Sequence, residues 1–371
     1  MHAKVLHIIN RLLTHFEYDI LFLIDKLRKT RVFMTKIVLD CYGGDNAPEE
    51  IVKGALDALD NDLDLSLVLT GKEDVLKTLV TRNSDRIEII DAQDVVTNDD
   101  VPTDAIRKKT ESSMVKAFDA LKNRDDIGGI VSAGSTGALL TGAFLKIGRI
   151  KGISRPAMAA LLPTVDGNNE GVVLCDCGAN VDCKPQNLLH FAIMADAYYK
   201  ITTGKNDARV ALLSNGTEDK KGSELNHEAF LLLKDSKLNF LGNMEARDII
   251  SGKYDVVVAD GFNGNIALKS LEGAGLSIFK MLKDNINAGG LRAKIGALLL
   301  KPALRKLKHT MDVNEKGGAV FLGANKVVVK IHGSSKARSV TVGLLQAANL
   351  ARRDITGAIR DALSDYEVEN A

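Results

Sequence analysis

The chain has 371 residues, of which 45% are hydrophobic, so it is long and apolar enough to bury a large core. The 49 Lys and Arg residues nearly cancel the 48 Asp and Glu residues, which excludes a surface built throughout to neutralise nucleic acid. Trp is absent and aromatic residues make up only 5%, which disfavours stacking on bases as a mode of binding.

The first 33 residues combine short apolar stretches with charges that interrupt them. No run approaches the ~20 apolar residues of a membrane span, and no small-residue cleavage site of a secretory signal follows. Two interpretations remain open, an amphipathic helix or a stretch upstream of a second start at Met34. We expect a cytoplasmic protein that lies at most at the inner face of the membrane.

From Lys36 onward, short β-branched runs alternate with helical periods, a pattern typical of βαβ units and a mostly parallel sheet. The expected strands are residues 37–39, 65–69, 87–90, 129–132, 158–162, 172–174, 210–213, 255–259 and 327–331. A helix is expected to begin at Pro48, with Ile51, Ala55 and Leu59 on its apolar face. The fold class is therefore α/β, with a central sheet flanked by helices, and residues 34–371 are expected to form a single catalytic unit.

Six of these strands run directly into a polar, Gly-containing loop that precedes a helix. The loops are residues 40–46, 132–137, 176–182, 214–218, 260–265 and 332–335. If the sheet is parallel, all six lie at its carboxyl edge, where ligands bind, and each places backbone N–H groups at a helix N-terminus. Any single loop can be explained by turns and caps alone, but six together favour a shared anion site.

The familiar catalytic motifs are missing, including the dinucleotide fingerprint, the phosphate loop, the zinc-protease motif and the nucleophile elbow. His332 is the best placed of the histidines, but the sequence pairs no nucleophile with it. Cations and amides remain near the strand ends: Arg107, Lys108, Asn180, Lys184, Asn215, Asn243, Arg247, Asn263, Asn265 and Lys269. Such a set suits a substrate that brings its own nucleophile, such as phosphate, and a thioester suits it as partner because a thiolate leaves without a strong acid.

The four cysteines fit no common zinc spacing, so we expect reduced thiols and no metal site. Gly290–Met311 carries basic residues and no acidic one, with Leu300, Leu304 and Leu307 on one stripe. Pro302 is expected to open a second short helix there. This basic pair of helices predicts an acidic partner, either a protein surface or an anionic lipid, although packing on the core or on a dimer mate is the alternative.

Residues 34–355 closely resemble the bacterial phosphate acyltransferases of phospholipid synthesis. The matching stretches are KIVLDCYGGDNAPEEIVKGALDAL, PTDAIRKKTESSM, SAGSTGALLTGAFLKIGRIKGISRPAMAALLPT, LCDCGANVDCKP, LLSNGTEDKKGSELNHEAF, FLGNMEARDI, VVVADGFNGNIALKSLEG and KIHGSSKAR. Departures are modest: Cys41 and Tyr42 stand where Ala and Met are usual, Ser135 replaces an Asn, and Lys336 stands where Asn is common. Residues 1–33 fall outside the family pattern.

The resemblance implies a fold similar to phosphate acetyltransferases and isocitrate dehydrogenases, a homodimer, and transfer of a fatty acyl group from acyl-[acyl carrier protein] to inorganic phosphate without a cofactor. It implies catalytic roles for Lys184, Asn180, His332 and Asp40. Substrate and phosphate contacts are expected at Gly43, Gly44, Asp45, Ser132, Gly134, Ser135, Thr136, Gly137, Asn215, Thr217, Asn263, Asn265, Lys269, Ser334 and Ser335. Carrier-protein or peripheral membrane contacts are expected at Arg292, Lys294, Lys301, Arg305, Lys306 and Lys308.

Two other functions stay open on the residues alone. A nicotinamide-dependent dehydrogenase on the related fold would use Asp176, Asp182 and Asp260 as metal ligands, although such residues also cap helices. A docking protein without catalysis would use only the basic segment, and it would not need the polar loops.

Overall fold

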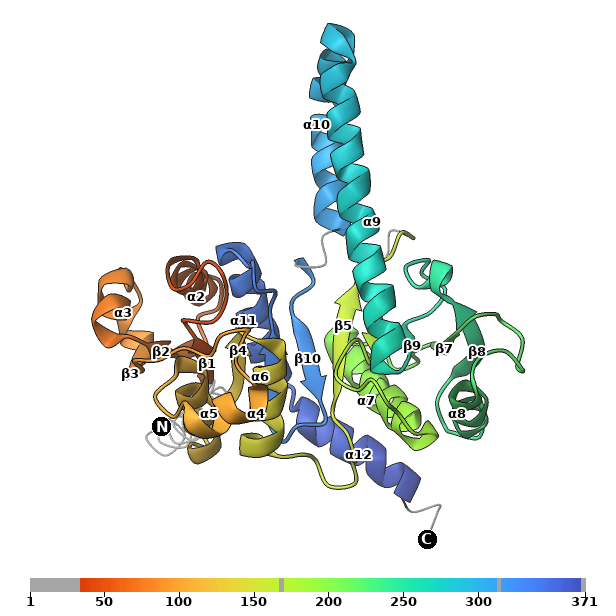
Figure 1. Cartoon of the computed structure of the whole chain (residues 1–371), viewed down its shortest axis with the longest axis horizontal. Coiled ribbons are helices and arrows are strands. Elements are labelled where there is room, and N and C mark those ends of the chain that lie inside the picture. The colour runs from red at the N-terminus through yellow and green to blue at the C-terminus, as the bar shows by residue number, and fades with distance from the viewer. Residues whose placement is uncertain (1–33, 167–169, 312–314, 368–371) are drawn as a thin grey trace, which may run out of the picture. The chain divides into compact units, whose positions relative to one another are not determined.

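The structure, a computed structural model, describes residues 34–166, 170–311 and 315–367. Residues 35–371 form one compact unit, drawn in Figure 1. Both interpretations of residues 1–33 concern a segment outside the described residues and stay predictions. None of the described helices is long and apolar enough to cross a membrane.

The described chain forms one eleven-stranded sheet in the order β3-β2-β1-β4-β11-β10-β5-β6-β9-β7-β8. The strands are β1 (Thr35–Asp40), β2 (Leu65–Gly71), β3 (Ile87–Asp91), β4 (Ile127–Ser132), β5 (Ala157–Leu162), β6 (Val172–Cys175), β7 (Val210–Ser214), β8 (Phe240–Glu245), β9 (Val256–Val258), β10 (Ala319–Leu322) and β11 (Val327–Lys330). Every expected strand is present. The sequence did not predict β10, nor β8, in which Gly242 and Asn243 interrupt the strand pattern.

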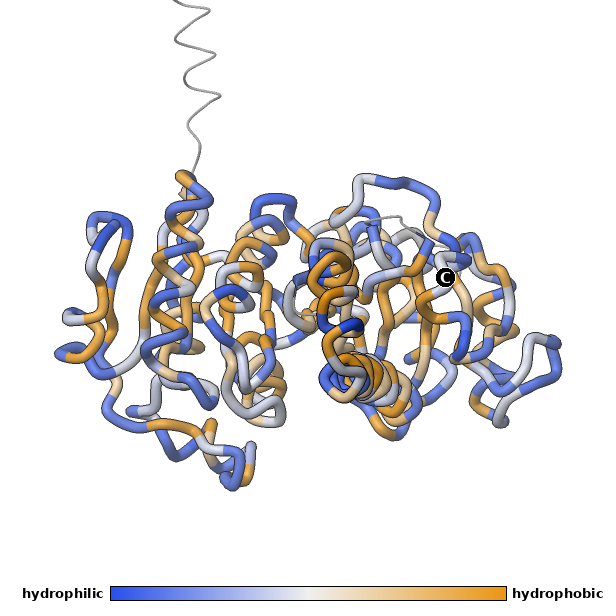
Figure 2. The backbone as a smooth tube through the Cα atoms, turned by 90° about the horizontal axis from the view of Figure 1, so that it is seen from above, coloured by the Kyte–Doolittle hydropathy of each residue, from blue (hydrophilic) through white to orange (hydrophobic). Residues whose placement is uncertain are grey.

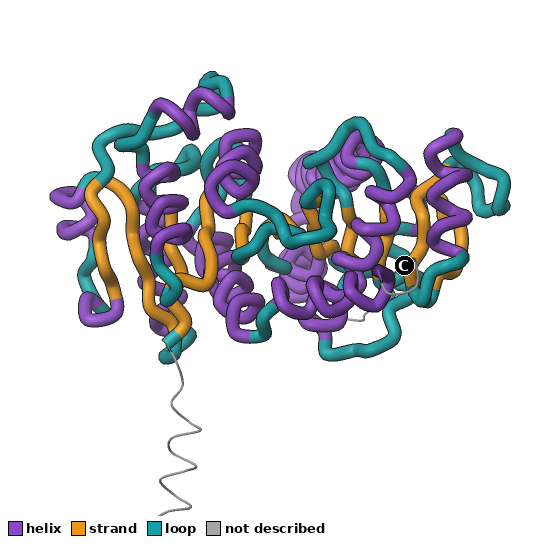
Figure 3. Tube along the Cα trace, turned by 90° about the horizontal axis from the view of Figure 1, so that it is seen from below, coloured by secondary structure: helices purple, strands orange, loops and turns teal. Residues whose placement is uncertain are grey.

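Helices cover both faces of the sheet, as the row of strands in Figure 3 shows. They are α2 (Glu49–Asn61), α3 (Glu73–Leu79), α4 (Pro102–Lys108), α5 (Ser113–Asn123), α6 (Thr136–Gly142), α7 (Pro185–Thr203), α8 (Glu224–Lys234), α9 (Gly261–Ala288), α10 (Gly290–Met311), α11 (Ala337–Arg352) and α12 (Ile355–Glu367). Helix α2 begins one residue after Pro48, and its predicted face of Ile51, Ala55 and Leu59 is buried. A π-helical turn, Ala143–Ile147, continues α6.

Two hydrophobic cores lie on opposite faces of the sheet because successive strand side chains point to opposite sides. In β1, Ile37 and Leu39 pack into the core that contains α2, α7 and α11, whereas Val38 packs into the core that contains α4, α5 and α6. Apolar residues lie along the strands and along the helices that pack on them, and hydrophilic residues gather in the peripheral loops (Figure 2). The fold class predicted from the alternating pattern is confirmed.

The two halves of the sheet run in opposite directions. Strands β3, β2, β1, β4 and β11 are mutually parallel, and so are β6, β9, β7 and β8. Three antiparallel pairings, β11 with β10, β10 with β5 and β5 with β6, reverse the direction between them. The prediction that all six polar loops lie at one edge is therefore wrong. The loops after β1, β4 and β11 share one edge, and those after β6, β7 and β9 share the other.

Helix α9 begins at the second of these edges and extends into a hairpin with α10 (Figure 1). The prediction of a new helix at Pro302 is also wrong, because α10 continues through Pro302 to Met311. Proline removes one backbone hydrogen bond. The surrounding Ala, Leu and Lys residues have high helix propensity and keep the helix intact on both sides.

Candidate active site

A cleft of about 640 Å³ lies between the two halves of the described chain. The loops after β1, β4 and β11 form one wall, and α9 forms the other. Between these walls it is also lined by β5, by the start of β10 and by residues 95–98. Five of the six polar loops contribute at least one lining residue, because Gly178 and Asn265 reach the cleft from the opposite edge. Only the loop of residues 214–218 is not part of it.

Asp40 connects two elements beneath the first wall. Its carboxylate accepts hydrogen bonds from the hydroxyl groups of Ser113 at 2.6 Å and Ser132 at 2.7 Å. The hydroxyl oxygen of Ser132 in turn accepts the backbone N–H of Gly134 at 3.0 Å. Burial raises the pKa of Asp40, and the two serine hydrogen bonds act against that rise. Asp40 therefore holds the loop after β4 in place from below and does not line the cleft itself.

Two glycines allow the loops of this wall to approach each other. A Cβ atom on Gly43 would lie 2.6 Å from the backbone nitrogen of Gly134 and 2.7 Å from a carboxylate oxygen of Asp40. Gly44 adopts φ +97°, and a Cβ there would meet Ala133 at 2.8 Å. The loops are also joined by a hydrogen bond from the Asp45 N–H to the Gly333 carbonyl at 2.8 Å. Larger residues at Gly43 or Gly44 would separate the loops.

The loop after β4 forms part of the cleft lining and leads directly into a helix. Gly134, Ser135 and Thr136 line the cleft, and α6 begins at Thr136. The first N–H groups of a helix have no intrahelical acceptor, and they carry the positive end of the helix dipole. Among the described residues, the side chain of Ser135 makes no capping hydrogen bond at this helix. The Gly134 N–H donates to Ser132, so the N–H groups of Ser135 and Thr136 are the ones open to an anion.

Helix α9 supplies the second wall. Asn265, Leu268, Lys269 and Glu272 face the cleft, and the ammonium group of Lys269 lies 2.7 Å from the Glu272 carboxylate. Lys269 is exposed, so this ion pair contributes little to stability. The wall therefore combines the apolar Leu268 with Lys269, whose ammonium group can leave the Glu272 carboxylate and bind an anionic ligand instead.

His332 lies at the rim of the cleft, in the loop after β11. Its Nδ1 lies 2.8 Å from the Ser334 hydroxyl and accepts the Ser334 backbone N–H at 3.2 Å. This network assigns the ring proton to Nε2, which makes His332 a hydrogen-bond donor at its other nitrogen. Ser334 therefore orients His332, while Ser335 is buried beneath and does not line the cleft.

Lys330, which the sequence did not single out, also lines the cleft. It is the last residue of β11, where the pattern predicted only a strand. Its ammonium group donates to the Ala133 carbonyl at 3.1 Å and to the Ile331 carbonyl. Burial lowers the pKa of Lys330 to about 8. The only signal in the sequence is a lysine at the end of an otherwise apolar strand.

Apolar side chains line the same cleft beside these polar groups. Val95 and Val96 come from the loop after β3, Met158 and Leu161 from β5, and Leu268 from α9. Most of these positions are buried, so they offer a dry surface next to the polar loops. A ligand with both an anionic and an apolar part fits this lining.

Besides Asp40, two more of the predicted catalytic residues lie outside this lining. Lys184 is the exposed residue that precedes α7, at the opposite edge of the sheet. The side-chain amide of Asn180 donates to the Pro156 carbonyl at 2.8 Å and to the Asp176 carboxylate at 2.7 Å. Both donors of Asn180 are thus used within the protein.

Other predicted contacts also lie elsewhere. Asn215 and Thr217 are exposed at the carboxyl end of β7. The side chain of Asn263 donates to Asp260 at 2.6 Å in the first turn of α9. Gly137 is exposed in α6 without lining the cleft. Of the predicted set, the cleft brings together Gly44, Asp45, Gly134, Ser135, Thr136, Asn265, Lys269 and His332.

Of the three carboxylates that a dehydrogenase would use, Asp176 and Asp260 have structural partners, and Asp182 is exposed. Asp176 accepts the N–H groups of Met158, Gly178, Ala179 and Asn180 at 2.8 to 3.1 Å. Asp260 accepts two N–H groups at the start of α9. Within the described part of the chain, no group of three or more His, Cys, Asp or Glu residues could hold a metal ion.

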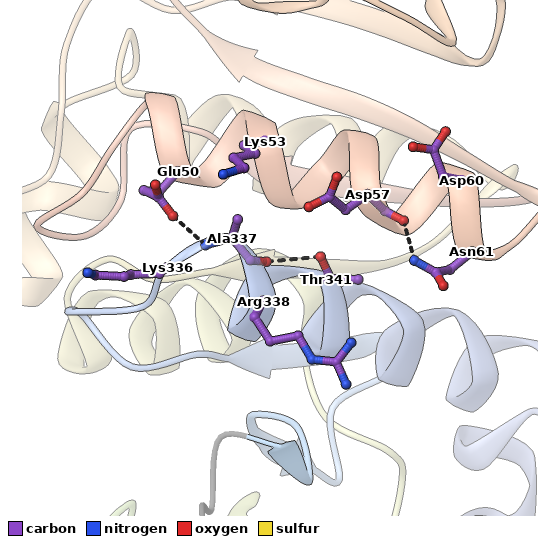
Figure 4. A pocket seen from close by; sticks show the side chains of 9 residues that line it. All are labelled: Glu50, Lys53, Asp57, Asp60, Asn61, Lys336, Ala337, Arg338 and Thr341. Atoms are coloured by element: carbon purple, nitrogen blue, oxygen red, sulfur yellow. Dashed lines mark hydrogen bonds between the residues drawn. The ribbon is translucent and has the colours of Figure 1, made fainter. Parts of the chain in front are cut away.

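A second, shallower groove of about 460 Å³ lies between α2 and α11 (Figure 4). The Glu50 carboxylate accepts the Ala337 N–H at 2.8 Å, and the Thr341 hydroxyl donates to the Gly54 carbonyl at 3.0 Å. These contacts join the two helices, and no residue predicted for the site lines the groove. We therefore assign it to helix packing.

The basic hairpin is exposed along its length. Arg292, Lys294, Lys301, Arg305 and Lys306 are exposed, and none forms an ion pair with a described carboxylate. The side chain of Lys308 lies outside the described residues. Exposed apolar residues lie between these basic residues, including Leu291, Leu298, Leu299 and Leu300. The surface is both basic and apolar.

Solved structures of known proteins share this fold. A phosphotransacetylase from Streptococcus pyogenes superposes with a TM-score of 0.57 at 20% identity, over 86% of this chain and 94% of that one. A branched-chain phosphotransacylase from Enterococcus faecalis superposes with a TM-score of 0.53 at 15% identity, over 86% of this chain and 99% of that one. At such identities these likenesses establish the fold alone.

Sequence relatives are closer. The family model described as "Fatty acid synthesis protein" matches residues 35–357. A phosphate acyltransferase from Lysinibacillus sphaericus is 43% identical over 90% of this chain and 100% of its own length. One from Bacillus pumilus is 45% identical over 87% of this chain and 96% of its own length. Because the match extends over nearly the whole of both chains, the protein is a member of the bacterial phosphate acyltransferase family.

Proposed function

We propose that the cleft transfers a fatty acyl group from acyl-[acyl carrier protein] to inorganic phosphate and releases acyl-phosphate for phospholipid synthesis. The observation that carries this proposal is the loop of Gly134, Ser135 and Thr136 at the start of α6, which lines a cleft with two lysines and an apolar side. An anion and an acyl chain can be held there side by side. Relatives named phosphate acyltransferase support this class of reaction.

Phosphate sits on the N–H groups at the start of α6, with the hydroxyl groups of Ser135 and Thr136 as further donors. Backbone N–H groups at a helix start bind phosphate in many proteins, because they are otherwise unpaired and lie at the positive end of the dipole. Lys269 faces the same space from α9. His332 donates from Nε2 to the anion or to the acyl carbonyl.

A phosphate oxygen then attacks the thioester carbon directly. The new C–O bond forms a tetrahedral oxyanion, the C–S bond then breaks, and the carrier thiolate leaves with the electron pair and takes up the proton that hydrogen phosphate gives up. An ordinary thiol has a pKa near ~8.5, so a strong general acid is not required. Ser334, whose hydroxyl lies 2.8 Å from His332 Nδ1, does not line the cleft. No Ser, Thr or Cys among the described lining residues is hydrogen-bonded to a histidine, so the lining itself offers an acyl-enzyme no activated nucleophile.

Catalysis in this scheme comes from position and charge. Orientation of two reactants can supply roughly 7–11 kcal/mol, and donors aimed at an oxyanion can add about 3–4 kcal/mol. Asp40, through Ser132, keeps the Gly134 N–H in place. Catalytic roles for Lys184 and Asn180 stay predictions, and the proposed site does not depend on them.

The acyl chain lies against Val95, Val96, Met158, Leu161 and Leu268 on the apolar side of the cleft. The exposed basic residues of α10 meet the acidic carrier protein that brings it, with an anionic membrane surface as the competing partner. Basic surfaces accelerate encounters with acidic partners. A homodimer, expected from the family resemblance, is part of the proposal and is testable by light scattering.

The direct test is an assay of the purified full chain with acyl-[acyl carrier protein] and isotopically labelled phosphate. Formation of labelled acyl-phosphate supports the reaction. Thr136→Ala combined with Lys269→Met should reduce the rate at least tenfold, because both groups face the bound anion. Full activity of this double variant would refute the site map and leave the fold untouched.

A further inference from the structure

Lys330 and Lys269 reach the cleft from opposite walls. Lys330 ends β11, Lys269 lies on α9, and both line the cavity. Lys269 already has the Glu272 carboxylate at 2.7 Å. Lys330 has no carboxylate within hydrogen-bonding distance among the described residues, and its partners are the carbonyl groups of Ala133 and Ile331.

The number of donors on Lys330 depends on its charge. A neutral amine carries two N–H bonds, which match the two carbonyl partners. Protonation adds a third N–H bond, for which the described residues offer no third acceptor. The Ala133 carbonyl immediately precedes the Gly134 N–H, so the ammonium group lies beside the start of the anion loop.

We propose that Lys330 is a further phosphate ligand that takes up a proton when the anion binds, and that Lys330 and Lys269 hold the same phosphate from opposite walls. This inference rests on the proposed function of the cleft. It assigns the third N–H of Lys330 to a phosphate oxygen. It also explains how two like charges face one cavity, since the anion between them relieves their repulsion.

The charges around Lys330 support proton uptake. Burial lowers its pKa to about 8, the carboxylates of Asp40 and Asp45 oppose that change, and Lys269 reinforces it. Tyr42 in the loop after β1, Glu272 on α9 and His332 in the loop after β11 are the other titratable groups of the described lining. In the free protein at pH 8.5, a large fraction of Lys330 is therefore neutral, and a bound dianion raises its pKa again.

The test measures binding of inorganic phosphate to the full chain by calorimetry at pH 8.5, in two buffers with different heats of ionisation. Phosphate is already a dianion at this pH. The binding enthalpies in the two buffers are expected to differ. That difference, divided by the difference in buffer ionisation heats, should give uptake of a substantial part of one proton per phosphate bound. The affinity is expected to fall about tenfold between pH 8 and pH 9.5, because protonation of Lys330 becomes linked to binding.

Two variants separate a ligand from a merely structural residue. Lys330→Met should abolish the proton uptake and weaken phosphate binding at pH 7.5 about tenfold or more, the usual range for one charge-assisted hydrogen bond. Lys336→Met removes an exposed lysine of the same segment that does not line the cleft, and it should change neither quantity. If Lys330→Met fails to fold, the wild-type heats in the two buffers still decide the question.

Phosphate binding without proton uptake at pH 8.5, or unchanged phosphate affinity in a folded Lys330→Met variant, would overturn the inference. Its failure is distinguishable from that of the reaction. If the Lys330→Met variant still forms acyl-phosphate and binds phosphate as tightly as the wild type, the proposed function stands and Lys330 has no role in phosphate binding. If the wild type takes up a proton on binding phosphate but forms no acyl-phosphate, the role of Lys330 stands and the proposed reaction is refuted.

Discussion

At the residue scale, the two serines that donate to Asp40 allow an effect on stability to be distinguished from an effect on phosphate binding. Ser113 and Ser132 donate to the same carboxylate, but only Ser132 also accepts the N–H of Gly134. Both serines are buried, so removing either hydroxyl group leaves a buried carboxylate oxygen of Asp40 without that hydrogen-bond donor. The two hydroxyl groups thus differ in what else they hold.

We therefore expect Ser113→Ala and Ser132→Ala each to lower the free energy of unfolding by about 1–3 kcal/mol. Only Ser132→Ala should also raise the KM for phosphate several-fold, because the Gly134 N–H loses its anchor. Denaturant unfolding and steady-state kinetics measure the two effects. Equal KM values in the two variants would show that the Gly134 contact has no role in binding.

The buried position of Lys330 also predicts how the free energy of unfolding depends on pH. Its pKa in the folded chain is about 8, below the ordinary value of 10.5, so the unfolded chain binds more protons between these values. Stability of the wild type should therefore rise as pH increases from 8 to 10.5, by about 1.4 kcal/mol for each pKa unit of the shift. Below pH 8 the cost of burying the charge is fully present.

Lys330→Met removes that charge. The variant is expected to be more stable than the wild type at pH 7 and to lose this advantage progressively above pH 8. Thermal unfolding at pH 7 and pH 10 measures the difference. A variant that is less stable at pH 7 by the same amount as at pH 10 would show that the buried charge is not costly.

At the scale of elements, α10 presents exposed Arg305 and Lys306 on the hairpin. Reversing both charges with Arg305→Glu and Lys306→Glu should weaken binding to the acidic carrier protein, with the larger effect at low salt because surface charges are screened as salt rises. The matched control is Lys122→Glu with Lys151→Glu, which changes the same charge on exposed residues elsewhere.

Carrier-protein affinity is measured by titration and liposome binding by sedimentation with vesicles containing anionic lipid. Weaker carrier binding alone identifies the protein partner, and weaker liposome binding alone identifies the membrane. If neither carrier-protein binding nor liposome binding is weakened, the basic residues of α10 serve a structural role.

Strand β5 offers a test of the acyl surface. Ala160 lines the cleft and is buried, next to Met158 and Leu161. Ala160→Leu adds volume there, so it should reduce the rate with long acyl chains more than with short ones. Comparing kcat/KM for a short and a long acyl-carrier substrate measures this. An equal loss for both lengths would place the acyl chain elsewhere.

At the scale of the whole molecule, the alternating pattern predicted the elements well and their assembly less well. The strands at 37–39 and 327–331 were visible because β-branched runs end in polar turns. Strand β8 was missed because Gly242 and Asn243 interrupt its pattern. Periodicity also carries no information on strand direction, so the reversal at β10, β5 and β6 could not be predicted.

The same limit explains which site residues came together. The loops around Gly44, Gly134 and His332 follow parallel neighbours, so the edge rule places them correctly. Asn215 follows a strand of the opposite direction and lies away from the cleft. Lys269 reaches the cleft because α9 extends from the far edge to the cleft. Lys330 was missed because its position at the end of a buried strand resembles an ordinary edge residue.

The central claim, direct attack of phosphate on the thioester, is tested by one measurement on the purified full chain. Acyl-[acyl carrier protein] is incubated with fully ¹⁸O-labelled phosphate, and product and protein are examined by mass spectrometry. Direct attack predicts acyl-phosphate that retains every ¹⁸O atom, thiol release only when phosphate is present, and no acylated protein. Thiol release without phosphate, accompanied by an acyl group bound to the chain, would contradict it.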